Sequence, residues 1–206
     1  MSFIMRWVVI GLAVLLLGGC DSVESIHQIG QPATEKQAKA LEGGWRGIDE
    51  GRQGFTIKHI KANELCVAGL EWNDKDSRFH VQQLTVFLTT DRDVLYANLL
   101  EIGDDGKPKP GPARYEFARL ALSSGGEALV IYPSNPGAFE KAVKDGTLKG
   151  TVKGDNGKTI TIEGTKEQWD QFIDPLKVAE QFDVNHPMVL IRQSKPEKNE
   201  NGVEKQ

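Results

Sequence analysis

Six short apolar segments follow one another between residues 55 and 133, and each is joined to the next by a turn or a Gly/Pro-rich loop. They are FTIKHI (55–60), ELCVAGLEW (64–72), RFHVQQLTVFLTT (78–90), VLYANLLEI (94–102), YEFARLAL (115–122) and EALVIYP (127–133). Apolar and polar residues alternate along several of them, as is typical of half-buried β-strands. Parallel neighbours need long, usually helical crossovers, so these connections predict an antiparallel meander.

Helix signals lie on either side of the meander. Thr34 can cap a short helix over TEKQAKALE, and Asn135-Pro136 and the capping box Thr165–Gln168 can start two more. The remaining strand signals are LKGTVKG (148–154), KTITIEG (158–164) and PMVLIRQ (187–193), the first two joined by an Asn-Gly turn. We therefore expect a mainly β fold, a meander closing into a barrel or half-barrel, with two or three short helices packed late in the chain.

The start of the chain has the composition of a signal peptide. Arg6 precedes WVVIGLAVLLL (7–17), an apolar run of 11 residues. At about 1.5 Å per residue, such a run is too short to cross about 30 Å of hydrocarbon as a helix. A basic start, an apolar core and small residues before a cleavage point predict a removable signal over residues 1–19.

Leu17-Gly18-Gly19-Cys20 resembles the lipobox of bacterial lipoproteins. The resemblance implies that the Cys20 thiol receives a diacylglycerol, that cleavage falls between Gly19 and Cys20, and that the new amine is acylated, commonly with palmitate. It also implies a cell-envelope protein that is held on the membrane by lipid and faces the periplasm. Asp21 resembles an inner-membrane retention signal, which slightly favours the inner over the outer membrane. An ordinary signal with a chance cysteine and an uncleaved anchor are the alternatives.

The rest of the chain divides by composition. We expect residues 20–42 to hold the lipidated cysteine, a polar tether over 21–33 and the short helix. Residues 43–193 should form one β-barrel-like domain, and the polar segment 194–206 should be disordered.

Gly43-Gly44-Trp45, at the start of the first strand, resembles the Gly-x-Trp signature of lipocalins. The resemblance implies a lipocalin-like barrel in which Trp45 plugs one end and Arg192, from the last strand, packs over the indole. The Thr-Asp-Tyr signature of that family is missing, because TTDRDVLY separates the acid from the tyrosine. The layout also resembles small bacterial envelope lipoproteins of this barrel type, for which the resemblance implies no established activity.

Charge excludes some classes of partner. Removal of the expected signal peptide also removes Arg6. The remaining chain has 24 Lys and Arg against 29 Asp and Glu, a net charge of −5. Such a chain lacks the basic surface that neutralises phosphates, so we expect no nucleic-acid partner and no second, electrostatic attachment to anionic lipid.

No catalytic motif stands out. If Cys20 carries lipid, Cys66 has no cysteine left to pair with, and its apolar setting favours a small buried side chain. The histidines His27, His59, His80 and His186 lack metal-ligand spacing, so we expect no metal and no cofactor. The favoured function is therefore non-enzymatic binding of a small apolar ligand or an envelope partner.

Two alternatives remain open. One is an assembly lipoprotein with a filled barrel and no ligand. The other is a thiol-dependent hydrolase that pairs Cys66 with His59 or His80.

Overall fold

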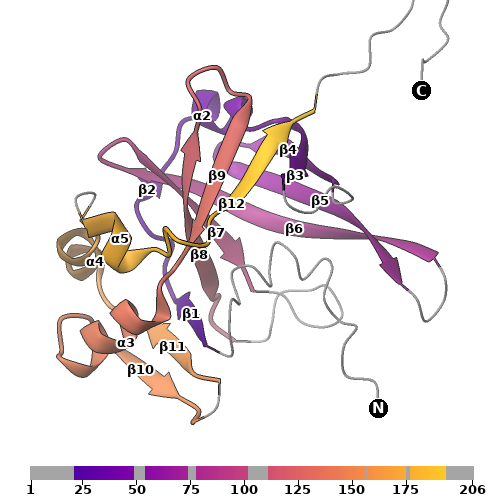
Figure 1. The fold of residues 1–206 in the computed structure, drawn as a ribbon. Coiled ribbons are helices and arrows are strands. Elements are labelled where there is room, and N and C mark those ends of the chain that lie inside the picture. The colour runs from indigo at the N-terminus through magenta and orange to yellow at the C-terminus, as the bar shows by residue number, and fades with distance from the viewer. Residues whose placement is uncertain are drawn as a thin grey trace, which may run out of the picture.

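The computed structural model describes residues 21–48, 54–73, 78–101, 111–155, 157–174 and 177–193. Residues 1–20, with the expected signal peptide and Cys20, and 194–206, with the expected disordered tail, lie outside the described residues. The elements, in chain order, are β1 (Ser22–Ser25), β2 (Gln31–Pro32), α2 (Glu35–Ala40), β3 (Gly43–Gly47), β4 (Gly54–Lys61), β5 (Glu64–Asn73), β6 (Arg78–Asp91), β7 (Val94–Leu100), β8 (Tyr115–Leu122), β9 (Ala128–Pro133), α3 (Pro136–Lys144), β10 (Gly150–Lys153), β11 (Thr159–Ile162), α4 (Lys166–Phe172), α5 (Val178–Gln181) and β12 (Met188–Arg192) (Figure 1).

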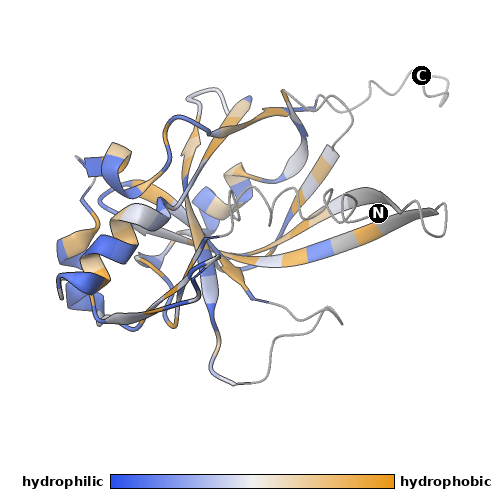
Figure 2. Cartoon of the chain, turned by 60° about the horizontal axis from the view of Figure 1, so that its bottom comes forward, coloured by the Kyte–Doolittle hydropathy of each residue, from blue (hydrophilic) through white to orange (hydrophobic). Residues whose placement is uncertain are grey.

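Eight antiparallel strands form a closed barrel, which confirms the expected mainly β fold. Strands β3 to β9 pair in chain order, β12 is inserted between β3 and β9, and the pairing of β8 with β9 closes the ring. Hydrophobic and hydrophilic residues alternate along the barrel strands (Figure 2). The alternation puts one face of each strand inside the barrel and the other outside.

The expected tether over residues 21–33 is wrong, because this segment is part of the fold. Strand β1 pairs in parallel with β11 and antiparallel with the start of β8, and β2 pairs with β6. Val23 and Ile29 are buried at 3% and 2% exposure, and this burial stabilises the attachment. Strands β1, β10 and β11 thus form a side sheet beside the barrel.

The described residues form two apolar cores. The first fills the barrel and comprises Ala33, Ala38, Leu41, Trp45, Phe55, Ile57, Leu65, Val67, Val86, Leu88, Ala97, Leu99, Leu120, Leu129 and Leu190. The second lies outside the barrel and comprises Val23, Ile29, Tyr96, Phe117, Phe139, Ala142, Leu148, Ile160, Ile162, Trp169, Ile173 and Phe182. It packs the late helices and the side sheet against the outer faces of β7 and β8.

Local sequence explains where the helices of this second core begin. The Asn135 side chain accepts from Gly137 N–H at the start of α3, and Thr165 and Gln168 form the expected capping box of α4. The ring of Phe117 then lies 5.2 Å from Phe139 and 5.4 Å from Trp169, edge to face. Burial here also raises the pKa of Tyr96 to about 12.

Within the described residues, no helix has the length and apolar character needed to cross a membrane.

Candidate functional site

One end of the barrel is closed by Trp45 and the turn after α2. The Trp45 side chain is completely buried, and its indole Nε1–H donates to the carbonyl oxygen of Leu41 at 2.9 Å. Leu41 is the C-terminal cap of α2 and is itself 1% exposed. Helix α2 begins at the expected cap, Thr34, whose side chain accepts from Gln37 N–H.

Arg192 lies over this plug. Its guanidinium carbon is 4.3 Å from the centroid of the Trp45 ring, a cation–π distance. Its Nε–H donates to Gly126 O at 2.7 Å, its Nη2 donates to Ala40 O at 2.6 Å, and its Nη1 donates to Glu42 O. One side chain therefore links the β8–β9 turn, the end of α2 and the plug.

Gly43 is required by this arrangement. Its φ of 138° is one that side-chain-bearing residues rarely adopt, and a Cβ there would lie 2.8 Å from Arg192 Nη1. The structure thus brings together Gly43, Trp45 and Arg192, the three residues that the lipocalin resemblance singled out.

Replacing Arg192 with lysine tests this closure. A lysine keeps the charge but lacks the planar fork that stacks on the indole and donates to three carbonyl groups. We expect Arg192→Lys to lower the free energy of unfolding by about 1–3 kcal/mol, measured by urea denaturation. An unchanged midpoint would show that the three hydrogen bonds and the stacking add nothing to stability.

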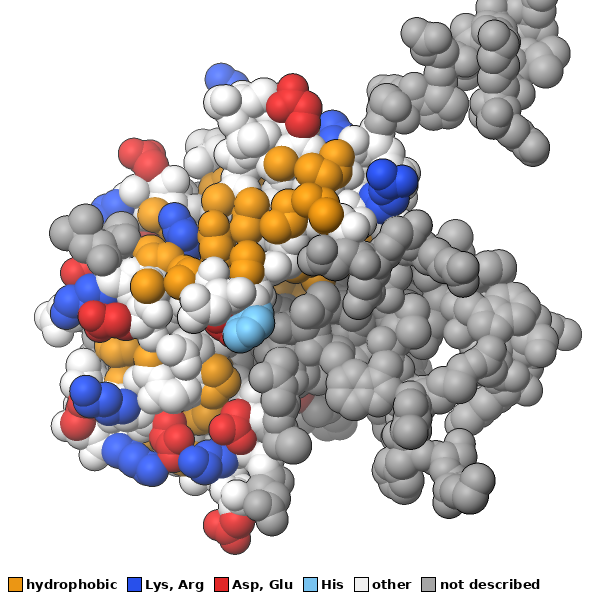
Figure 3. All heavy atoms as spheres, in the orientation of Figure 1, with side chains coloured by type: hydrophobic (Ala, Val, Ile, Leu, Met, Phe, Trp, Pro, Cys, Tyr) orange, Lys and Arg blue, Asp and Glu red, His pale blue; other side chains and the backbone are white. Residues whose placement is uncertain are grey.

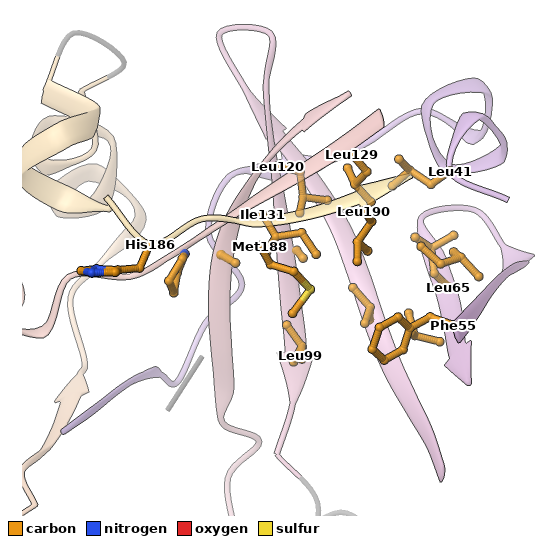
Figure 4. A pocket seen from close by; sticks show the side chains of 16 residues that line it. Leu41, Phe55, Leu65, Leu99, Leu120, Leu129, Ile131, His186, Met188 and Leu190 are labelled. Carbon is orange, nitrogen blue, oxygen red and sulfur yellow. The ribbon is translucent and has the colours of Figure 1, made fainter. Parts of the chain in front are cut away.

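Behind the plug, an apolar cavity of about 50 Å³ runs inside the barrel. The side chains around it come from the barrel strands and from both ends (Figure 4). They are Leu41, Phe55, Ile57, Leu65, Val67, Val86, Ala97, Leu99, Ala118, Leu120, Leu129, Ile131, Pro133, His186, Met188 and Leu190. Leu41 stands at the closed end and His186 stands at the other end (Figure 4), so the lining extends along the barrel.

Among the described residues of this lining, His186 contributes the one hydrogen-bonding side chain with nitrogen or oxygen, and Figure 4 shows it pointing away from the aliphatic side chains. Its side chain is 82% exposed, and Nδ1 lies 2.9 Å from Asp183 Oδ2. Burial acts to raise the pKa of Asp183, but hydrogen bonds from His186 and Asn185 lower it overall. The deep lining is therefore apolar, and a hydrogen-bonding side chain stands at the open rim.

The strand register bears on the alternative of a thiol-dependent hydrolase, which needs Cys66 beside His59 or His80. Cys66 lies between Leu65 and Val67, which face the barrel interior, so its side chain is on the outer face. His59 pairs with Leu65 on the opposite face, and its Nε2 lies 3.0 Å from Ala62 O. His80 pairs with Glu71, while Cys66 pairs with Thr85, five positions away along β6. The strand register therefore pairs Cys66 with neither histidine.

Of the expected lipid-attachment residues, Gly19 and Cys20 lie outside the described residues, and Asp21 is ordered. The Asp21 carboxylate accepts from Lys158 N–H at 2.8 Å. Among the described residues, no group of three or more His, Cys, Asp or Glu side chains could hold a metal ion.

Comparison with protein-family models, with curated proteins and with solved structures finds no match to this chain.

Proposed function

We propose that this protein is a lipid-anchored, non-enzymatic envelope protein whose barrel binds one slender apolar chain, such as a fatty acyl group. The lipobox resemblance at Leu17–Cys20 supports lipid attachment and a position facing the periplasm, and Asp21 favours the inner membrane. The observation that carries the binding role is the cavity, closed at Trp45 and apolar along its depth.

The size of the cavity restricts the ligand. A water-sized group needs about 10–15 Å³ of such space, so 50 Å³ admits about three to five groups in a row and excludes a fused-ring ligand. Met188 lines the cavity, and rotation of its flexible thioether can lengthen the space. A polar headgroup finds no partner deep inside, so it would remain at the rim beside His186.

A fluorescent fatty acid, cis-parinaric acid, tests the proposal in a chain that begins at Asp21 and keeps every described contact. We expect saturable binding of one probe per chain, and competition by unlabelled fatty acid. Absence of saturable binding would contradict the proposal.

Filling the cavity should abolish this binding. Ala97 is 7% exposed and faces the cavity from β7, so Ala97→Leu adds three carbon atoms to a space of about 50 Å³. We expect at least a tenfold weaker affinity in the same titration, with overpacking costing about 1–3 kcal/mol of stability. Val81→Leu is the matched control, because Val81 is 62% exposed on β6. If Ala97→Leu and Val81→Leu bound the probe with equal affinity, the probe would bind outside the barrel.

A second candidate, an interaction protein without a ligand, is favoured by apolar side chains on the outside of the barrel. Ile48 is 56% exposed and Ile191 is 38% exposed, and Ile48 N–H donates to Val189 O of the same strand pair. Hydrophobic side chains gather over β9 and β12 in Figure 3. A barrel that binds no probe but crosslinks to an envelope protein through this surface would favour this function.

A further inference from the structure

The chain enters the side sheet immediately after position 20. The Asp21 carboxylate accepts from Lys158 N–H at 2.8 Å, and Ser22 N–H donates to Lys158 O at 2.7 Å. From Ser22 onward, β1 is paired with β11, beginning with Ser22 and Thr159. Asp21 is thus the last residue that could have served as a spacer, and it is held on the domain.

This attachment leaves no flexible linker between the domain and an anchor on Cys20. Consecutive α-carbons are about 3.8 Å apart, so the α-carbon of Cys20 lies within that distance of an ordered residue. A flexible linker would allow the barrel to turn freely above the membrane. Here the point of attachment belongs to one end of the side sheet.

The same end of the side sheet contains the β10–β11 turn. Because β1 and β11 run in parallel and start together, Asp21 and Lys158 are adjacent to the turn that begins after Lys153. In Figure 1 this turn and the start of β1 lie at the bottom, whereas α2 and the β8–β9 turn lie at the top. The closed end of the barrel is therefore remote from the anchor.

We propose that this end of the side sheet, made of Asp21, Lys153, Asp155 and Lys158, rests on the headgroup surface of the bilayer and directs the closed end of the barrel away from it. The inference rests on the lipid attachment in the proposed function. Lys158 is also paired with Glu140 at 3.0 Å, and Glu140 with Lys144 at 2.6 Å. With this pair included, acidic and basic side chains still balance at this end, so the lipid anchor, and not charge, holds it there. The orientation should therefore not depend on the content of anionic lipid.

Fluorescence quenching tests the orientation in the processed, lipid-modified full chain, reconstituted in phosphatidylethanolamine vesicles. In a Cys66→Ser background, an environment-sensitive dye is attached to Lys153→Cys or to Ser124→Cys, which lies in the β8–β9 turn; both positions are exposed. A lipid with a nitroxide on its headgroup serves as the quencher. We expect at least threefold stronger quenching at position 153 than at 124, unchanged when phosphatidylglycerol is added.

A matched linker variant makes the test specific. Twelve Gly and Ser residues inserted between Cys20 and Asp21 give a reach of about 20 Å, which should bring the two positions to similar quenching. Equal quenching in the parent chain, with flotation on vesicles retained, would overturn the orientation and leave the anchor intact. Loss of flotation of the parent chain would overturn the lipid anchor and the orientation together.

Discussion

Replacing Trp45 with alanine is expected to lower the free energy of unfolding by about 3–5 kcal/mol, because it removes the whole plug from one end of the barrel. The indole is fully buried, donates to Leu41 O and supports the Arg192 guanidinium at 4.3 Å. For a domain of this size, the loss corresponds to a fall in Tm of roughly 10 °C, which calorimetry measures directly.

Two further variants separate the parts of this effect. Trp45→Phe keeps an aromatic ring beneath Arg192 but leaves the carbonyl of Leu41 without its donor, and should cost about 1–3 kcal/mol. Ile60→Ala, at a position 49% exposed on β4, should change stability by less than about 0.5 kcal/mol. If Trp45→Ala had the same Tm as Ile60→Ala, the Trp45 plug would have no structural role.

Replacing Cys20 with serine should have the largest effect on the cellular state of the protein. Serine offers no thiol for the diacylglycerol that the lipobox resemblance implies. We expect the wild-type chain to lack residues 1–19 and to carry the mass of the lipid, whereas Cys20→Ser carries no lipid and remains uncleaved after Gly19. Intact-mass spectrometry of detergent-extracted protein measures both changes.

Cys66→Ser is the matched control, because it removes the other cysteine in the chain. Cys66 lies on the outer face of β5, and its replacement should leave the lipid mass unchanged. A wild-type chain that carries no added lipid mass would contradict the proposed lipid anchor. That result would be independent of what the barrel binds.

Most strands of the barrel could be predicted from local sequence, because several of them alternate and turns or Gly/Pro-rich loops mark where they end. YEFARLAL was expected over residues 115–122, and β8 has these bounds. The caps at Thr34, Asn135 and Thr165 were likewise recognisable, since each side chain accepts from a backbone N–H two or three residues ahead.

Strand β1 could not be predicted in this way. Its four residues, SVES, are too few to show a period, and its parallel partner in β11 lies 137 residues further along the chain. Pairing over such a distance depends on tertiary packing, because the buried Val23 belongs to the same core cluster as Phe139 of α3 and Trp169 of α4.

The candidate site was predictable in part. Gly43, Trp45 and Arg192 could be identified because they resemble a known signature, and the register of β3 and β12 places Trp45 opposite Arg192. Leu99 and Met188 were not singled out, although alternation puts them on inward faces. The cavity volume depends on how these side chains fill the closed ring, which no single strand encodes.

The most direct test of a binding barrel is native mass spectrometry of the chain from Asp21 onward, purified without detergent from a bacterial envelope, beside Ala97→Leu. We predict that the parent retains about one fatty acid or single-chain lipid per protein, lost on denaturation, and that Ala97→Leu retains none. A bare mass for the parent, together with no exchange into added fatty acid, would contradict the binding function.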